Sequence, residues 1–291
     1  MTNLLGVIGD IVEDVVVAMR APFAAGSDTP SDIVRRRGGS AANVAVAASA
    51  LVPTRFFGCV GDDATGRRLA AELAPSIDAR LQVSSAAPTG TIVVILDAHG
   101  ERHMFPDRGA NLCLTPIDDA QLASLAVLHA TAYSLDSGTT ADVVPAALAT
   151  VAASGRVTSL DVSSAALISQ FGVSRLLGVI NQLRPTLLLA NADEASLLGW
   201  DALEPWAAGL VIVKHGAGPA LVRTPVGAWR VPTTPLPVTD TTGAGDAFAA
   251  GVLASVILSG LSVKTLLAGG EALAVMLAQA GHRAAAVRLL G

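Results

Sequence analysis

A short glycine-rich segment carries two carboxylates and opens a long apolar stretch of the sequence. It reads DTTGAGD over residues 240–246, and the residues after it predict a helix over Ala244–Leu258. Glycines at the start of a helix let backbone N–H groups converge on an anion, and the helix dipole adds positive potential there. Asp246 lies in the first turn, where it is either a helix-terminal charge or a base that takes a proton from an attacking hydroxyl.

A second glycine pair also leads into a predicted helix, in the sequence GGSAAN that begins at Gly38. In one interpretation Ser40 is an ordinary N-cap. In the other, Gly38 and Gly39 let a ligand approach the backbone closely and Asn43 contacts it. Asp10 follows the first predicted strand, and ligands of α/β proteins bind at the carboxyl ends of strands.

Charged and imidazole side chains near these segments allow further contacts. The three arginines from Arg35 to Arg37 are typical of a solvated face. On a strand, however, the side chains of Arg35 and Arg37 point to the same face of the sheet. These two arginines, or Arg108, could meet an anionic substrate. His99 and His103 are close in sequence without a third ligand nearby, so we interpret them as surface or lid residues rather than a metal site.

Short apolar runs alternate with helical stretches along most of the chain, and such alternation predicts a parallel sheet covered by helices. Strands are expected at Leu4–Ile8, Arg55–Val60, Val127–Ala130, Thr158–Val162, Leu187–Ala190 and Leu210–Val213. Helices are expected at Ala41–Leu51, Arg67–Leu73, Ala141–Ala153, Val173–Gln182, Ala244–Leu258 and Val263–Gln279.

Two strand-rich segments, residues 12–37 and 89–107, interrupt the alternation. We infer that they pair as a small separate sheet, a lid, over an α/β core. An exposed edge or apolar face of this lid is a candidate surface for a homodimer. The expected lid strands are Val15–Met19, Ile33–Arg37 and a hairpin of Thr89–Leu96 with Glu101–Phe105. The expected core comprises residues 1–11, 38–88 and 108–291.

Composition excludes several classes of protein. The 291 residues are 52% hydrophobic with a net charge of −5, so a sizeable core is expected and disorder is not. No basic excess is present to meet the phosphates of a nucleic acid.

The uncharged stretch Ala247–Val263 is shorter than the roughly 20 residues of a membrane span, so we interpret it as a buried helix. Cys59 and Cys113 are too few for a disulfide framework, and the first residues lack the basic start of a signal peptide. These features favour a cytoplasmic protein without a membrane or nucleic-acid partner.

Together, these segments resemble the ribokinase-like (PfkB) family of carbohydrate and nucleoside kinases over essentially the whole chain. Residues 37–49 (RGGSAANVAVAAS) are similar to the first family signature and residues 240–250 (DTTGAGDAFAA) to the second. Five shorter family motifs also occur along the chain in the order typical of the family. They are Gly9-Asp10, Gly58–Asp63, Arg108–Asn111, Asn191–Glu194 and Lys214–Gly218. The resemblance implies a ribokinase-like three-layer α/β/α core with a mostly parallel sheet, plus a small β-sheet lid.

The resemblance also implies roles for single residues in phosphoryl transfer. Asp246 matches the catalytic base, and Gly243, Ala244 and Gly245 match the anion hole for the transferred group. The expected substrate contacts are Asp10, Gly39, Asn43 and Asn111, to which we add Gly38 and Arg108.

Further matches concern the nucleotide and its ions. Asn191 and Glu194 match a motif that organises Mg²⁺ and phosphate, with Glu194 reaching the ion through water, which suits an ion that keeps several waters. The expected nucleotide-facing loop contains Lys214, Gly216 and Gly218, although Lys214 could instead point outward as a solvated charge. Asp240 matches a position near a monovalent-cation site, so K⁺ is a possible second ion.

We therefore expect an enzyme that uses ATP and Mg²⁺ to phosphorylate a hydroxyl of a small sugar. A nucleoside kinase of the same family is the alternative, but it needs a partly aromatic pocket, and only Phe23, Phe105 and Tyr133 are placed to help. A non-catalytic sugar- or nucleotide-binding protein is a remote alternative, because Asp246 and its neighbouring glycines are all present. No Walker A segment occurs and no G-x-G-x-x-G follows the first strand, which excludes the P-loop and counts against a Rossmann dehydrogenase.

Overall fold

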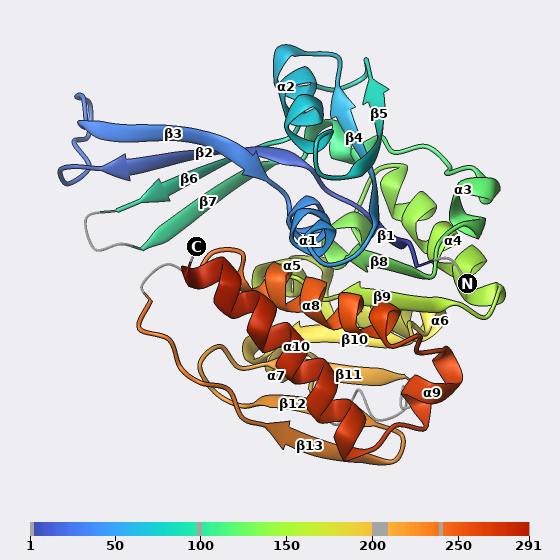
Figure 1. Cartoon of the computed structure of the whole chain (residues 1–291). Coiled ribbons are helices and arrows are strands. Elements are labelled where there is room, and N and C mark those ends of the chain that lie inside the picture. The colour runs from blue at the N-terminus through green and yellow to red at the C-terminus, as the bar shows by residue number, and fades with distance from the viewer. Residues whose placement is uncertain (1–2, 98–100, 200–208, 239–240, 291) are drawn as a thin grey trace.

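Two β-sheets that share no strand form the framework of the protein (Figure 1). The structure is a computed structural model and describes residues 3–97, 101–199, 209–238 and 241–290. The large sheet is parallel in every neighbouring pair from β11 to β5, whereas β12 and β13 add antiparallel pairs at one edge. Its strands, in spatial order, are β13 (Gly227–Val231), β12 (Ala220–Thr224), β11 (Leu210–Lys214), β10 (Leu187–Asn191), β9 (Val157–Asp161), β8 (Val127–Thr131), β1 (Leu5–Ile8), β4 (Thr54–Gly61) and β5 (Asp78–Ser84).

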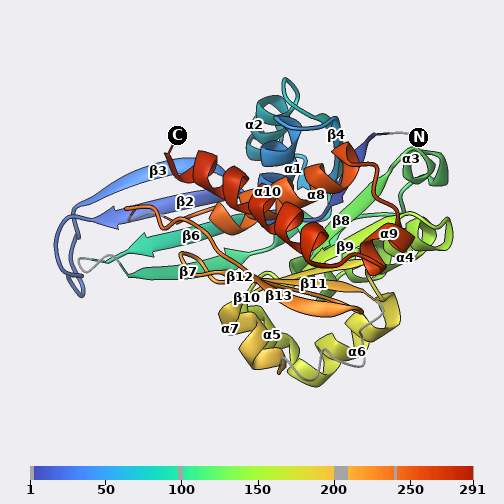
Figure 2. The ribbon, with the colours of Figure 1, turned by 60° about the horizontal axis from the view of Figure 1, so that its bottom comes forward.

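Helices cover both faces of this sheet, which makes three layers (Figures 1 and 2). Each face has its own group of buried side chains, because alternate residues of a strand point to opposite faces: Val7 packs in one group and Ile8 in the other. One face carries α1 (Ser40–Ser49), α2 (Ala64–Leu73), α8 (Ala244–Leu258), α9 (Val263–Leu267) and α10 (Glu271–Leu290). The other carries α3 (Asp119–Ala123), α4 (Thr140–Ala153), α5 (Ala165–Phe171), α6 (Val173–Leu183) and α7 (Ala192–Leu198). The predicted fold class is confirmed.

The small sheet projects from one side of the large one (Figure 1). Its order is β3 (Ser31–Gly38), β2 (Val12–Met19), β6 (Thr91–Leu96) and β7 (Arg102–Asp107). The buried Glu13 carboxylate of β2 accepts from Arg35 of β3 at 2.5 Å and from Arg68 of α2 at 2.7 Å. One acidic side chain therefore ties two strands of the small sheet to a helix of the core.

The uncharged stretch of the sequence forms a buried helix, as expected. Ten residues of α8 are buried, among them Phe248. Within the part of the chain that the structure describes, no helix has both the length and the apolarity of a membrane span.

The predicted helix Val263–Gln279 is wrong, because the chain forms two helices there. α9 ends at Leu267, and α10 begins at Glu271 after a glycine pair that lacks helix-favouring side chains. α10 then continues past Gln279 to Leu290 through an alanine-rich stretch, since alanine is the best helix former. Strands β5, β12 and β13 were not predicted, because none of them is a continuous apolar run. The residues of β5 are half-buried or exposed, and burial alternates along β12 and β13.

A histidine lies inside the large sheet. His129 of β8 is fully buried, and its Nδ1 lies 3.0 Å from Ser159 Oγ on β9. Its Nε2 has no hydrogen-bond partner among the described residues. Burial lowers the pKa of His129 to about 4. The imidazole is therefore neutral in the folded protein at neutral pH.

We expect acid to destabilise the protein through this histidine. In the unfolded chain His129 binds a proton near the ordinary pKa of about 6.5, whereas the folded protein resists protonation down to about pH 4. The free energy of unfolding should therefore fall as the pH drops across this range, by roughly 3 kcal/mol in all. Denaturant unfolding at several pH values checks this, with His129→Gln for comparison. An equally steep pH dependence in the variant would contradict the assignment.

Candidate active site

The candidate base lies where the first turns of two helices meet. α8 begins after Gly243, whose φ of 76° is left-handed, and Asp246 is in its first turn. From α1, Ser40 Oγ donates to Asp246 Oδ1 at 2.6 Å, and Asn43 Nδ2 donates to Oδ2 at 2.9 Å. The two glycine-led helices of the sequence thus converge on one carboxylate.

Burial changes the acid strength of this carboxylate. It raises the pKa of Asp246 to about 6, although the hydrogen bonds from Ser40 and Asn43 act in the opposite direction. Such a base is still ionised at neutral pH and accepts a proton more readily than an ordinary aspartate. The arrangement suits removal of a proton from a hydroxyl group.

Contacts within the protein explain why glycines occupy the two positions before α1. A Cβ at Gly38 would overlap the Asp14 carboxylate, and one at Gly39 would lie 2.6 Å from the carbonyl oxygen of Asp10. Gly39 also has a left-handed φ of 97°. The Asp10 carboxylate accepts hydrogen bonds from the first two backbone N–H groups of α1 at 3.0 Å. These contacts fix the entry to α1 and, with it, the position of Ser40.

Asn111 and Arg108, which were also expected to contact the substrate, contact other residues of the protein. Asn111 Oδ1 accepts from the Ile11 N–H at 2.8 Å, and its Nδ2 donates to the Ile11 carbonyl at 2.9 Å. The guanidinium of Arg108 lies over the Tyr133 ring, 4.3 Å from its centre. The Asn111 bonds join the segment between β1 and β2 to the segment after β7. Contact of either side chain with a substrate remains a prediction.

The acidic motif expected to organise Mg²⁺ caps helix α7. Asn191 and Glu194 form a capping box, in which each side chain accepts from the other residue's backbone N–H at 2.8–2.9 Å. Glu194 is only 1% exposed. Burial, and after it the nearby Asp161, raise the pKa of Glu194 to about 7.

Lys214 points inward rather than into solvent. Its Nζ lies 2.6 Å from Asp161 Oδ2, and both side chains are buried. Burial favours the neutral amine, but the Asp161 carboxylate outweighs it and the pKa of Lys214 is raised. The ammonium is also 3.6 Å from the position that a Cβ would take at Gly245. A buried positive charge therefore stands beside the glycine loop of α8.

A cavity of about 740 Å³ connects these groups. The expected site residues that line it are Asn191, Glu194, Lys214, Gly216, Ala244, Gly245 and Asp246. The other described ones lie outside its lining: Asp10, Gly38, Gly39, Asn43, Arg108, Asn111, Gly218 and Gly243. Asp240 lies outside the described residues. The cavity thus brings together the expected base, the anion-hole loop and the nucleotide-facing residues.

Comparison with known proteins identifies the family. A sequence profile described as pfkB family carbohydrate kinase matches residues 2–287. The chain belongs to this family. An ATP-dependent ribose-1-phosphate kinase from Halopiger xanaduensis is 30% identical over 254 residues, covering 83% of this chain and 80% of the relative. A fructokinase from Klebsiella pneumoniae is 29% identical over 276 residues, covering 90% and 87%.

Solved structures agree with the assignment of this chain to the PfkB family. A fructokinase from Xylella fastidiosa aligns with a TM-score of 0.84 and 25% identity, over 100% of this chain and 92% of that one. An adenosine kinase from Sinorhizobium meliloti has the same fold, with a TM-score of 0.81 and 24% identity over 99% and 94%. The predicted family is confirmed, and so is the enzyme class, a phosphotransferase with an alcohol group as acceptor.

Sequence reasoning missed several side chains at the centre of the PfkB site. Ser40 was considered only as an N-cap, although its hydroxyl contacts Asp246. Asp161 ends strand β9, and the rule that selected Asp10 could have selected it too. The cavity is also lined by Gln279, His282 and Arg283, because α10 continues beyond its predicted end. No sequence signal pointed to these three.

The carboxylates of the PfkB site suit a magnesium ion. Glu194 and Asp161 both line the cavity with Asn191, and together they offer the hard oxygen ligands that Mg²⁺ prefers. The charge of Asp161 raises the pKa of Glu194, so the two acidic groups repel each other. Lys214 already neutralises part of this charge at Asp161, and a divalent cation beside Glu194 and Asp161 would relieve the remaining repulsion.

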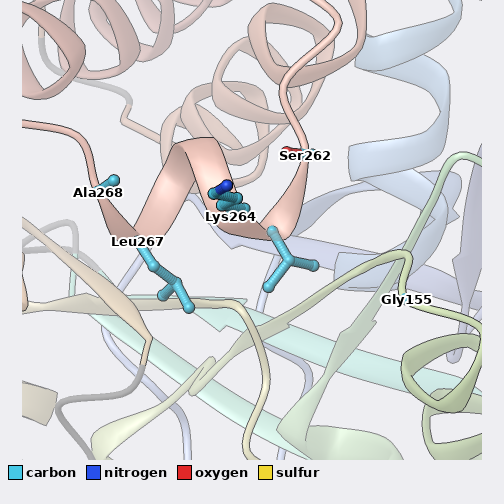
Figure 3. Close-up of a pocket in the computed structure, with 6 residues that line it drawn as sticks. Gly155, Ser262, Lys264, Leu267 and Ala268 are labelled. Atoms are coloured by element: carbon cyan, nitrogen blue, oxygen red, sulfur yellow. The ribbon is translucent and has the colours of Figure 1, made fainter.

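A second hollow lies on the surface beside α9 and has different chemistry (Figure 3). Its volume is about 650 Å³, and Lys264 is the charged residue in its lining. Leu267 and Ala268 give it an apolar wall. No carboxylate is among the described residues of its lining, so these residues offer no base for phosphoryl transfer.

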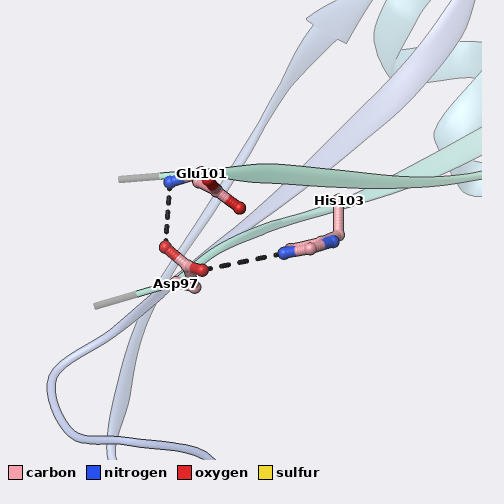
Figure 4. A group of neighbouring side chains, drawn as sticks. All are labelled: Asp97, Glu101 and His103. Carbon is pink, nitrogen blue, oxygen red and sulfur yellow. Dashed lines mark hydrogen bonds and ion pairs between the residues drawn. The ribbon is translucent and has the colours of Figure 1, made fainter. Parts of the chain in front are cut away.

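The histidine of the expected hairpin belongs to a small polar group (Figure 4). The Glu101 N–H donates to Asp97 Oδ1 at 2.8 Å, and His103 Nε2 lies 3.8 Å from Asp97 Oδ2. His103 is on β7 of the small sheet. The expectation that no further ligand lies near it is wrong, because Asp97 and Glu101 bring carboxylate oxygens within 4.8 Å of its imidazole. His99 lies outside the described residues.

Proposed function

We propose that this chain transfers the terminal phosphoryl group of ATP to a hydroxyl group of a small sugar. The observation that carries the proposal is Asp246, a half-buried carboxylate in the first turn of α8 with a pKa of about 6. Its cavity also holds Lys214 and the anion-hole loop. The names of the relatives, fructokinase and ATP-dependent ribose-1-phosphate kinase, support a sugar as acceptor and ATP as donor.

In the proposed reaction Asp246 takes the proton of the acceptor hydroxyl as its oxygen attacks the terminal phosphorus. The backbone N–H groups of the Gly243–Gly245 loop and the start of α8 stabilise the charge of the transferred group. Lys214 adds a positive charge beside this loop, and Asp161 keeps its ammonium in place. Glu194, Asn191 and Asp161 would hold Mg²⁺, which neutralises phosphate charge when it is bound.

The aromatic side chains favour a sugar over a nucleoside. Phe23 is 75% exposed and Phe105 is 57% exposed, so neither contributes to a closed pocket for a base. Tyr133 has one face covered by Arg108. Phe23, Phe105 and Tyr133, which the sequence suggested for a nucleobase, therefore do not form an aromatic pocket.

Two further expectations belong to the proposal. Exposed apolar side chains of the small sheet, including Ile33 and Met104, support a homodimer through this sheet. K⁺ near Asp240 stays a prediction, because residues 239–240 lie outside the described part of the chain.

A panel of acceptors tests the function. The purified protein is mixed with Mg·ATP and, in turn, with fructose, ribose, ribose 1-phosphate or adenosine, and ADP formation is followed. We expect at least one sugar to raise the rate at least tenfold over the rate without acceptor. Omission of Mg²⁺ should abolish the increase.

The outcomes separate the alternatives. Turnover with adenosine alone would favour the nucleoside kinase. A preference for ribose 1-phosphate over ribose would point to the arginines of the small sheet as contacts for an anionic acceptor. No acceptor-dependent ADP formation with any compound would contradict the proposed function.

A further inference from the structure

The last turn of α10 brings an arginine to the glycine loop of the site. The guanidinium Nε of Arg288 lies 3.1 Å from the position that a Cβ would take at Gly243. Gly243 is the residue before the first turn of α8. Because this position has no side chain, the guanidinium can lie against the backbone of the expected anion hole.

Close packing of α10 against α8 brings the backbone at Arg288 near this loop. A Cβ at Gly281 would lie 2.7 Å from the Phe248 ring, and one at Gly251 would lie 2.7 Å from Ala284 Cβ. The two helices therefore approach through glycines, and a shift along either axis would create an overlap. Arg288 is seven residues after Gly281, on the same face of α10 two turns later. In both views the C-terminal end of α10 points toward the small sheet (Figures 1 and 2).

The charges around Arg288 call for an anion. Arg288 is exposed and has no ion-pair partner among the residues that the structure describes. Arg37 also lacks a carboxylate partner there and donates instead to Asn43 Oδ1 at 2.8 Å. Burial lowers the pKa of Arg37, the charges of Glu72, Asp14 and Asp246 raise it, and the charge of Arg288 lowers it, so the two guanidiniums are close enough to repel. Both lie near the positive end of the α8 dipole.

Lys214 lies at the other end of the same loop, beside Gly245, but its charge is already matched by Asp161. Arg288 is thus the cation at the glycine loop whose charge no described carboxylate neutralises. The planar guanidinium also presents several N–H donors in the geometry that suits phosphate oxygens.

We infer that Arg288 is a catalytic residue that binds the phosphoryl group while it passes from donor to acceptor, an inference that rests on the proposed function. The acceptor oxygen forms its bond to phosphorus, and the bond from phosphorus to the bridging oxygen breaks. The hydroxyl proton goes to Asp246, and the electron pair of the broken bond stays on the leaving ADP. Arg288 keeps its protons and donates hydrogen bonds to the oxygens of the moving group, where charge is spread in the transition state.

The test compares Arg288→Gln, Arg288→Lys and, as a matched control, Arg230→Gln, a variant of an exposed arginine on β13. Rates are measured with Mg·ATP and the sugar that the wild-type protein phosphorylates best. We expect Arg288→Gln to lower kcat by roughly 100-fold or more. The KM for ATP should change less than threefold, because the contact is made mainly in the transition state. Arg288→Lys should recover part of the loss, and Arg230→Gln should match the wild type.

A kcat for Arg288→Gln within tenfold of the wild type overturns the inference, as does a loss confined to KM. Thermal unfolding of each variant separates loss of fold from loss of catalysis. If Arg288→Gln unfolds, Arg288→Lys decides: at least a tenfold loss of kcat supports the inference, and a smaller loss overturns it. A wild-type protein without activity on any sugar overturns the proposed function itself, whereas an active wild type with an equally active Arg288→Gln overturns only the role of Arg288.

Discussion

Asp246→Asn should lower kcat by at least about 10³-fold and leave the dissociation constant for Mg·ATP within threefold of the wild type. An amide has the shape of the carboxylate but cannot take the proton of an attacking hydroxyl. Ser40 and Asn43 still hold the side chain from α1, so the fold should be kept. Turnover and nucleotide titration measure the two quantities. Asp118→Asn, which changes an exposed N-cap on α3, is the matched control.

The pH dependence of the wild type belongs to the same prediction. Because burial raises the pKa of Asp246 to about 6, the base is protonated and inactive below this pH. We expect kcat to rise with pH through about 6 and then to level. A normal turnover rate in Asp246→Asn, or a rate already constant from pH 4.5 upward, would contradict the assignment of the base.

Lys214→Met should reduce both stability and activity. The substitution leaves the Asp161 carboxylate buried without its partner, and breaking one side of a buried ion pair typically costs about 3–5 kcal/mol of unfolding free energy. It also removes the positive charge beside the glycine loop of α8, for which we expect a fall in kcat of about 100-fold. Denaturant unfolding and steady-state rates measure the two effects.

A double variant distinguishes the two roles of this pair. Lys214→Met with Asp161→Leu replaces both charges by apolar groups, so most of the lost stability should return. The kcat should stay low, because the double variant lacks both the positive charge beside the glycine loop and a carboxylate proposed to hold Mg²⁺. The chain has one other lysine, the exposed Lys264, and Lys264→Met is therefore the natural control. Recovery of activity in the double variant would show that Lys214 acts only on stability.

The sequence predicted those parts of the fold whose signals are local. Apolar runs marked the central strands, and glycine-led segments marked the starts of α1 and α8. The break before α10 had a local signal as well, the pair Gly269 and Gly270, which the uninterrupted apolar pattern around it obscured. The strands β12 and β13 lack a continuous apolar run, because burial alternates along each of them with half-buried or exposed residues.

In the site, single positions were predictable and their pairing was not. Asp246 stood out through the glycines before it, but its donor Ser40 lies 206 residues away in the chain. The sequence allowed Lys214 to face the nucleotide or to point outward into solvent. Its direction depends on Asp161, which lies on a strand that is not adjacent to β11 in the sheet. Arg288 had no motif around it. Its place depends on the packing of two helices, which no local pattern encodes.

The hydrogen bonds that hold Asp246 have a consequence for water. Both of its carboxylate oxygens accept from donors of the chain, one from Ser40 and one from Asn43. A lone water molecule that displaces either donor exchanges one hydrogen bond for another and gains little. A sugar that binds through several hydroxyls gains contacts elsewhere that offset the exchange. In the proposed reaction the carboxylate would thus select its acceptor by size as well as by chemistry, which would protect the donor nucleotide from wasteful hydrolysis while no sugar is bound.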